Sequence, residues 1–278
     1  SLLYGLGCLR TGLVLRLAAS LFYLGRFREI LDLLVAHEER LDRLGDSALT
    51  GLFHFQAGLV WSLVGDTERS DEHARKALEA SRLSGDEATM GKAQYVLALD
   101  GLWWGRSHEV VSHGSTAAAL LERTGEQYWL GLTHWVLGIN YALVGKFDVA
   151  LGEETKCGEI GSEIGSTRLE TYAAWATGAI RAFMGEAEAG IDACRRSLER
   201  HLDHRALPPL GAQLEVGLAG DDGASQVVAQ EHADRGLLHP CDVDAGERPA
   251  KDLRSRLAGF SEAVGLLPAD RRGRRTDH

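Results

Sequence analysis

Two sets of side chains have residue types that could bind a metal or transfer a proton. His201 and His204, with Asp203 between them, could approach an ion from one helix end, and His108 with His113 form a similar pair. Neither set has the spacing and the further ligands of a zinc site. We therefore expect these histidines to be solvated surface residues.

Other candidates for chemistry are weaker. His54 and His134 share one column of a repeat described below but lie two units apart, so stacking at about 10 Å per helix layer would separate them by tens of ångströms. The four cysteines, Cys8, Cys157, Cys194 and Cys241, form no Cys-x-x-Cys pair and favour a reducing compartment. Nothing pairs a cysteine with a histidine base. We expect no catalytic site, metal or cofactor.

Two short motifs also have simple explanations. Gly217, Gly220 and Gly223 are spaced like part of a nucleotide-binding loop, but no strand precedes them and no Gly-Lys-Ser/Thr follows. A turn is the better interpretation. The basic run 271–275 lies in a terminal segment and is typical of a frayed tail.

Composition narrows the class of protein. Hydrophobic residues make up 45% and charged residues 25%, as in a soluble globular protein. The formal net charge of −10 argues against a nucleic-acid groove, which needs clustered Lys and Arg. The apolar run 11–24 resembles a signal peptide, but Arg16 interrupts it and Ala18 falls in register with the repeats, so we expect a core helix. We expect a cytoplasmic protein without a membrane partner.

The elements that would position any site are set out by glycines. Two ladders step by forty residues: Gly5, Gly45, Gly85, Gly125, Gly165 and Gly25, Gly65, Gly105, Gly145, Gly185. Apolar residues between them recur at helical spacing, and no useful stretch alternates as a strand would. A fixed period of this length is typical of a solenoid in which helical hairpins stack on one another. The sequence predicts an all-α superhelix of about five hairpins.

Columns of equivalent residues support this interpretation. Thirteen residues after each opening glycine the side chain is small: Ala18, Gly58, Ala98, Gly138 and Gly178. We expect two helix backbones to approach closely there. The preceding column, Leu17, Ala57, Leu97, Leu137 and Thr177, is mainly aliphatic and is predicted to be buried. Asp46 and Ser47 predict a helix cap.

The fourth unit has a more specific pattern. Leu137-Gly138-Ile139-Asn140-Tyr141, then Gly145, Phe147 and Ala150, resembles the tetratricopeptide repeat. The family period is 34 rather than forty, and His134 stands at the family's Trp position. Forty-residue variants are similar to the repeat regions of bacterial signalling ATPases, nucleotide-cyclase-linked regulators and LuxR-type regulators. The resemblance implies a right-handed α-α superhelix that binds partners in a concave groove.

The predicted organisation divides at residue 204. The repeat array covers 1–204, in units 1–44, 45–84, 85–124, 125–164 and 165–204. Residues 205–240 are a degenerate sixth repeat or a cap, since two prolines stand where a helix should begin. A loop, an amphipathic helix and the basic tail make up 241–278, and a change of reading frame after about 204 is an open alternative.

One column suggests a binding site. Ten residues after each opening glycine come Leu15, Phe55, Tyr95, Trp135 and Trp175, with Leu52, Lys92, Leu132 and Tyr172 three residues earlier on the same face. By the resemblance, these positions line the groove that takes a peptide or a partner helix, and aromatic rows are common hot spots. Packing between repeats is the alternative. Of the cationic groups that clamp a carboxylate in chaperone-binding members, only Lys92 is present.

These observations lead to two hypotheses about function. The first is a non-catalytic interaction or signal-relay scaffold within a larger ATPase or cyclase-type regulator. The second is a small-molecule effector sensor of a transcriptional regulator, with the effector in the same aromatic cleft. An enzyme would need a nucleophile and a base within reach of each other.

Overall fold

The computed structural model describes residues 2–186, 188, 190–193 and 195. Over these residues the chain forms helices and turns without strands, which confirms the predicted all-α class. The helices are α1 (Leu2–Tyr23), α2 (Phe27–Leu44), α3 (Ser47–Leu63), α4 (Thr67–Ser84), α5 (Glu87–Trp103), α6 (Ser107–Thr124), α7 (Gln127–Leu143), α8 (Phe147–Glu163) and α9 (Thr167–Phe183).

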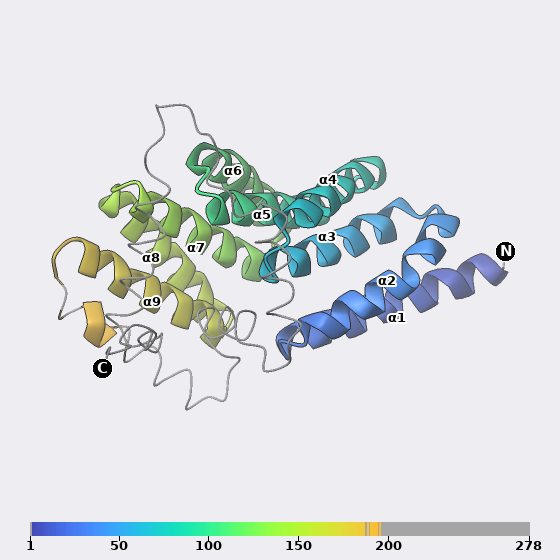
Figure 1. Cartoon of the computed structure of the whole chain (residues 1–278), viewed down its shortest axis with the longest axis horizontal. Coiled ribbons are helices and arrows are strands. Elements are labelled where there is room, and N and C mark those ends of the chain that lie inside the picture. The colour runs from blue at the N-terminus through green and yellow to red at the C-terminus, as the bar shows by residue number, and fades with distance from the viewer. Residues whose placement is uncertain (1, 187, 189, 194, 196–278) are drawn as a thin grey trace, which may run out of the picture.

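The helices form hairpins that follow one another along an arc (Figure 1). Each helix packs on its neighbours in the chain, and α1, α3, α5, α7 and α9 also pack on one another in that order. Within the described residues, α2, α4, α6 and α8 make no comparable contacts among themselves. The odd-numbered helices therefore form the inner layer, and the even-numbered helices form the outer one. This arrangement is the helical-repeat superhelix of the tetratricopeptide type.

The turns explain the glycine ladders. Between successive helices the chain reverses through a glycine with positive φ, and this angle ranges from 64° at Gly45 to 96° at Gly185. Only glycine adopts this left-handed conformation cheaply. Around Gly85 the amide of Asp86 donates to the carbonyl oxygen of Ser81, which satisfies one of the last helical carbonyls. Gly5 differs, because it lies inside α1.

Side chains at the helix starts satisfy the free amides. The Asp46 carboxylate accepts from the amides of Ala48 and Leu49, which confirms the predicted cap. Asp66 and Asp86 repeat this arrangement at α4 and α5. An acceptor at this position stabilises a helix by about 1 kcal/mol.

The small-residue column marks the close approach of paired helices. A Cβ atom added at Gly58 would lie 3.2 Å from both the amide nitrogen of Ala74 and the carbonyl oxygen of Ser70. At Gly138 it would collide with the buried carboxyl group of Glu154. The predicted limit on side-chain size is confirmed at these two positions.

The first helix is a core element on one side only. Val14, Leu15, Ala18 and Leu21 are buried, which agrees with the predicted core helix. Leu17, predicted to be buried, is 50% exposed, whereas its equivalents Ala57, Leu97 and Leu137 are buried. They lie on the face that packs against the preceding hairpin, and α1 lacks such a neighbour within the described residues. In that part of the chain, 4–22 is also the one helical stretch apolar and long enough to cross a membrane.

Several predictions fall on residues outside the described part of the chain. These are the second half of the fifth unit after residue 195, the sixth repeat or cap at 205–240, and the segment 241–278. His201, Asp203, His204, the glycines from 217 to 223 and the basic run 271–275 lie there as well.

Candidate functional site

The structure separates the histidines that were considered as a pair. His108 is exposed and lies 3.8 Å from the carboxylate of Glu109. His113 is partly buried, and its Nδ1 is 2.7 Å from the side-chain oxygen of Gln94. His113 is therefore a bonded residue of the hairpin rather than a solvated one, because the turn of the helix directs it toward α5.

His54 and His134 each have a partner within their own hairpin. His54 Nδ1 lies 2.9 Å from Nδ1 of His73, and His134 Nδ1 lies 2.6 Å from the carboxylate of Glu153. Each pair joins the two helices of one unit, nineteen residues apart. The two histidines do not meet, as the repeat spacing predicts.

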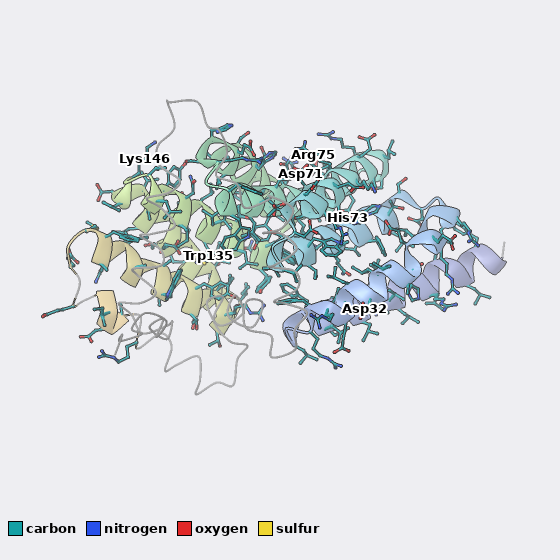
Figure 2. The ribbon with its side chains drawn as sticks, viewed as in Figure 1. Asp32, Asp71, His73, Arg75, Trp135 and Lys146 are labelled. Atoms are coloured by element: carbon teal, nitrogen blue, oxygen red, sulfur yellow. The ribbon has the colours of Figure 1, made fainter. Side chains whose placement is uncertain are left out.

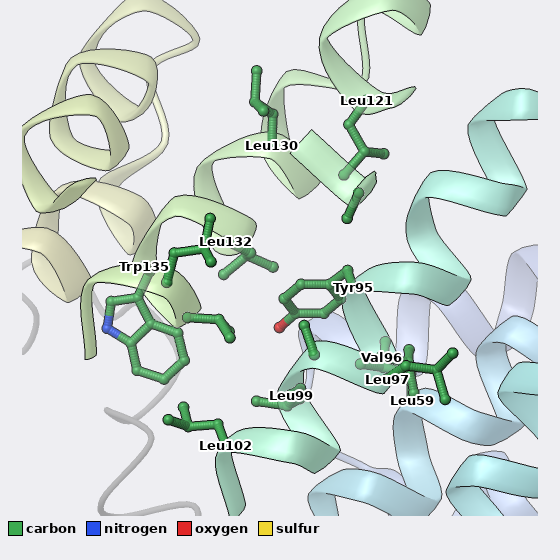
Figure 3. Packing of buried hydrophobic residues seen from close by; sticks show 14 of the residues in the cluster. Leu59, Tyr95, Val96, Leu97, Leu99, Leu102, Leu121, Leu130, Leu132 and Trp135 are labelled. Carbon is green, nitrogen blue, oxygen red and sulfur yellow. The ribbon is translucent and has the colours of Figure 1, made fainter. Parts of the chain in front are cut away.

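The aromatic column lies on the inner layer. Phe55 on α3, Tyr95 on α5 and Trp135 on α7 are 3%, 4% and 3% exposed, and they belong to one core cluster. Figure 3 shows Tyr95 between α5 and α7, with its hydroxyl group directed toward the side of Leu132 and Trp135. These three side chains therefore pack between adjacent repeats, which is the alternative that the sequence left open.

The other members of the predicted groove are close to the same cluster. The ring of Tyr172 contacts that of Trp135 in a tilted arrangement, at a ring-centroid distance of 5.3 Å, and Leu132 is buried beside them. Leu52 and Trp175 pack against the cluster while partly exposed. Lys92 donates to the Glu126 carboxylate over 2.8 Å, so this amine is already paired.

A small cavity lies where the inner helices converge. It encloses about 30 Å³, roughly the volume of one water molecule, and is lined from α1, α2, α3, α5, α7 and α9. Its aromatic and cationic lining residues are Phe22, Phe27, Tyr95, Tyr128, Trp135, Arg168 and Tyr172. Residues far apart in the sequence thus meet at one point inside the arc.

The cavity lining combines apolar rings with hydrogen-bond donors. Arg168 donates to the Tyr128 hydroxyl over 3.0 Å, and its guanidinium lies 5.7 Å from the centre of the Phe22 ring. Nε1 of Trp135 is buried without a hydrogen-bond partner in the described structure. Burial raises the pKa of Tyr172 to about 12 and the pKa of Tyr95 well above its usual value, so both phenols keep their protons at neutral pH.

The sequence could have pointed to two of the residues that it missed. Tyr128 and Arg168 both stand three residues after an opening glycine, where the earlier units have Cys8, Ala48 and Ala88. A change from small to large polar side chains in successive units is a visible signal. Trp129, which contacts the rings of Phe22, Phe55, Tyr95 and Tyr128, has no such signal.

Comparisons with known proteins agree with this fold. A Rap protein solved in complex with competence and sporulation factor aligns with a TM-score of 0.67 and 16% identity, over 93% of this chain and 70% of that one. The apo form of RapI aligns with a TM-score of 0.57 and 14% identity, over 92% and 94%. These likenesses show the fold alone. Protein-family models and curated proteins give no match.

Proposed function

We propose that this chain is a non-catalytic scaffold that binds a peptide or partner helix on the inner face of its arc. The carrying observation is the cavity where Phe22, Trp135 and Arg168 meet from three helices. A side chain inserted there would contact the first hairpin and α9 at once. Binding would therefore change the curvature of the array, which is a means of relaying a signal to an attached domain.

The chemistry of the lining favours a peptide. Aromatic rings provide stiff apolar area for an anchoring side chain. The unpartnered Nε1 of Trp135 is closed off from solvent in this structure. Once the inner helices moved apart it would donate to a carbonyl oxygen, which peptides offer at every residue. A bound carbonyl would satisfy a buried donor whose isolation costs about 1–3 kcal/mol. The complex of a Rap protein with competence and sporulation factor supports the proposal by analogy of fold.

A small-molecule effector is the second candidate from the sequence, and the cavity gives it less support. Preformed pockets for such ligands enclose about 300–1,000 Å³, far more than the 30 Å³ found here. A sensor would have to open the core before any ligand could enter. A peptide anchor also requires the inner helices to move apart, but only far enough to admit one side chain.

The proposal includes a setting for the chain. We place it in a larger regulator of the signalling-ATPase, cyclase-linked or LuxR type, in the cytoplasm. The free thiols of Cys8 and Cys157 are consistent with a reducing compartment. Whether an ATPase, cyclase or DNA-binding domain is attached is tested by the sequence of the native gene product on both sides of this chain.

Selection from a phage-displayed random peptide library tests the binding face. The affinity of the selected peptides for the wild-type chain is then compared by calorimetry with their affinity for Arg168→Ala and for Trp135→Phe. Both variants alter the cavity, and Trp135→Phe does so with little loss of apolar volume. We expect each change to weaken binding by about 2 kcal/mol, roughly 30-fold, as for a hot-spot residue.

The matched control is Arg75→Ala. Arg75 is an exposed residue of the outer helix α4, paired with Asp71 over 2.6 Å (Figure 2). Its removal should leave peptide affinity unchanged. Peptides that bind both cavity variants as tightly as wild type would contradict the proposed binding face.

A further inference from the structure

A second group of side chains lies outside the aromatic cavity. Nδ1 of His54 on α3 is 2.9 Å from Nδ1 of His73 on α4, and Glu38 reaches the pair from α2. One ligand atom from each of the three residues lies within 4.8 Å of the others. We propose that Glu38, His54 and His73 bind a divalent transition-metal ion of the Zn²⁺ class, joining the first hairpin to the second.

The geometry suits such an ion. Zn²⁺ binds imidazole nitrogen at about 2.0–2.1 Å, so two nitrogens 2.9 Å apart can share one ion with an angle of about 90° between them. A tetrahedral site separates its ligand atoms by roughly 3.4 Å on the same bond lengths. The three ligand atoms lie within 4.8 Å of one another, so closing the site needs the carboxylate of Glu38 to approach by at most about 1.4 Å and the two nitrogens to separate by about 0.5 Å, which the half-buried side chains of Glu38 and His73 permit.

The other repeats act as an internal comparison. The position of the His54–His73 pair is taken by Gln94 with His113 in the third unit and by His134 with Glu153 in the fourth. Each of those pairs matches a donor with an acceptor. Two histidines face each other in the second unit, where they hydrogen-bond only as opposite tautomers.

An acidic residue at the position of Glu38 occurs only next to the unit that carries the two histidines. Glu38 stands thirteen residues after Gly25, and the equivalent residues after the later turn glycines are Leu78, Ala118 and Gly158. The one unit that supplies two facing histidines is therefore the one preceded by an acidic residue at this position. Packing alone does not require this coincidence, because the other units pack without it.

The surroundings of His54 and His73 favour the neutral imidazole, which can bind a metal, over the protonated form. Burial lowers the pKa of His54 to about 4 and also lowers the pKa of His73, although the Glu38 carboxylate acts in the opposite direction on His73. Neutral imidazoles keep a free lone pair, as metal binding requires. Glu72, Lys76 and Arg69 of α4 are the further charged groups nearby, and Glu72 is paired with Lys76 over 2.7 Å.

The arrangement leaves room for solvent on the ion. His54 is 5% exposed and forms the floor, whereas Glu38 and His73 are half-buried. Three protein ligands and an accessible position are typical of sites that keep a bound water. Imidazole ligands select Zn²⁺, Co²⁺, Ni²⁺ or Cu²⁺ over Mg²⁺ and Ca²⁺.

Metal titration of the untagged, chelator-treated full chain tests the proposal. We expect saturable binding of one Zn²⁺ per chain, and a Tm higher by about 5–10 °C at a hundredfold excess of Zn²⁺ over its Kd. Co²⁺ should give the visible absorption of a site with nitrogen and oxygen ligands. Mg²⁺ should produce neither effect.

Two variants and one control make the test specific. His54→Gln recreates the pairing that Gln94 and His113 already show, so it removes a ligand while preserving a hydrogen bond. Glu38→Gln alters a half-exposed residue and keeps the side-chain volume. Either change should weaken Zn²⁺ binding by more than the roughly 10–100-fold that loss of an outer-shell partner costs.

His113→Gln is the control, since it removes a comparable histidine elsewhere in the array. It should bind Zn²⁺ as the wild type does. Absence of saturable binding to the wild type, or equal binding by both variants and the control, would overturn the proposal.

Discussion

At the residue scale, Asp100 is a carboxyl group buried between two adjacent units. Ser62 on α3 donates to its Oδ1 over 2.6 Å, while Oδ2 has no hydrogen-bond partner in the described structure. Burial raises the pKa of Asp100 from 3.8 to about 7. The folded chain therefore holds a proton more tightly than the unfolded chain does. Stability falls as the pH rises from about 4 to about 7, and the loss persists above that range.

Asp100→Asn should remove this dependence. Asn140 already occupies the equivalent position in the fourth unit and is 3% exposed. We expect the variant to gain free energy of unfolding relative to wild type as the pH rises, by on the order of 2–4 kcal/mol at pH 8. Urea denaturation at pH 5 and pH 8 measures the difference.

The exposed Asp71 provides the comparison for that experiment. Asp71→Asn removes an exposed pair and a minor cause of the raised pKa of Asp100, so it should change stability far less than Asp100→Asn does at pH 8. A gain for Asp100→Asn that is the same at both pH values would contradict the assignment of the proton to this group.

Residue types and spacing placed Tyr95, Trp135 and Tyr172 on one face of the array, and the structure has them around one cavity. Phe22 and Trp129, whose rings lie 6.3 Å apart, could not be added from the pattern. They belong to units that are far apart in the chain, and they meet because small rotations between successive hairpins accumulate. Such rotations depend on side-chain packing and leave no periodic signal.

At the element scale, the period of forty follows from helix length. The helices from α3 to α9 have 17 or 18 residues each, and turns of two or three residues separate them. A period longer than the 34 residues of the tetratricopeptide family requires longer helices or longer turns. The helices account for it. Glycine turns and apolar spacing predicted these elements because both are local properties of the chain.

Glycines within one helix should respond differently to substitution. A Cβ atom at Gly161 of α8 would lie 2.9 Å from the amide nitrogen of Glu170, whereas Gly152 in the same helix has nothing within 4 Å. We expect Gly161→Ala to destabilise the chain by about 1–3 kcal/mol, because backbone must move. Gly152→Ala should stabilise it by about 0.5–1 kcal/mol. Thermal unfolding of both variants checks the opposite signs.

An equal change in stability for the two variants would contradict this prediction. If Gly161→Ala were as stable as Gly152→Ala, the close packing of α8 against α9 would be wrong.

At the scale of the whole molecule, the arc closes on itself through a few side-chain contacts. The ring of Phe22 at the end of α1 lies 6.3 Å from the ring of Trp129 on α7, more than a hundred residues away. The guanidinium of Arg168 on α9 lies 5.7 Å from the centre of the same Phe22 ring, and Phe55 on α3 lies 5.0 Å from Trp129. The extensive helix–helix contacts, in contrast, join helices that are neighbours or next neighbours in the chain. The curvature of the array is therefore held by a small number of aromatic contacts around the cavity.

Phe22→Ala should loosen this closure. We expect a loss of about 1–2 kcal/mol, together with a larger radius of gyration and easier quenching of tryptophan fluorescence, because the ring contacts with Trp129 disappear. Small-angle scattering and acrylamide quenching measure the two effects. Leu24→Ala, at a residue that is 62% exposed in the same turn, should change neither. Identical scattering from both variants and wild type would show that another contact sets the curvature.

The nearest-neighbour packing of the hairpins also sets how the chain would respond to a pulling force. Each hairpin loses only the surface that it shares with the next when it is peeled away. A molecule stretched between its ends would therefore lengthen in steps of one hairpin, with the ring contact across the arc breaking before any helix unwinds. In a regulator held at both ends, such an array would extend elastically only after the contacts across the arc had broken.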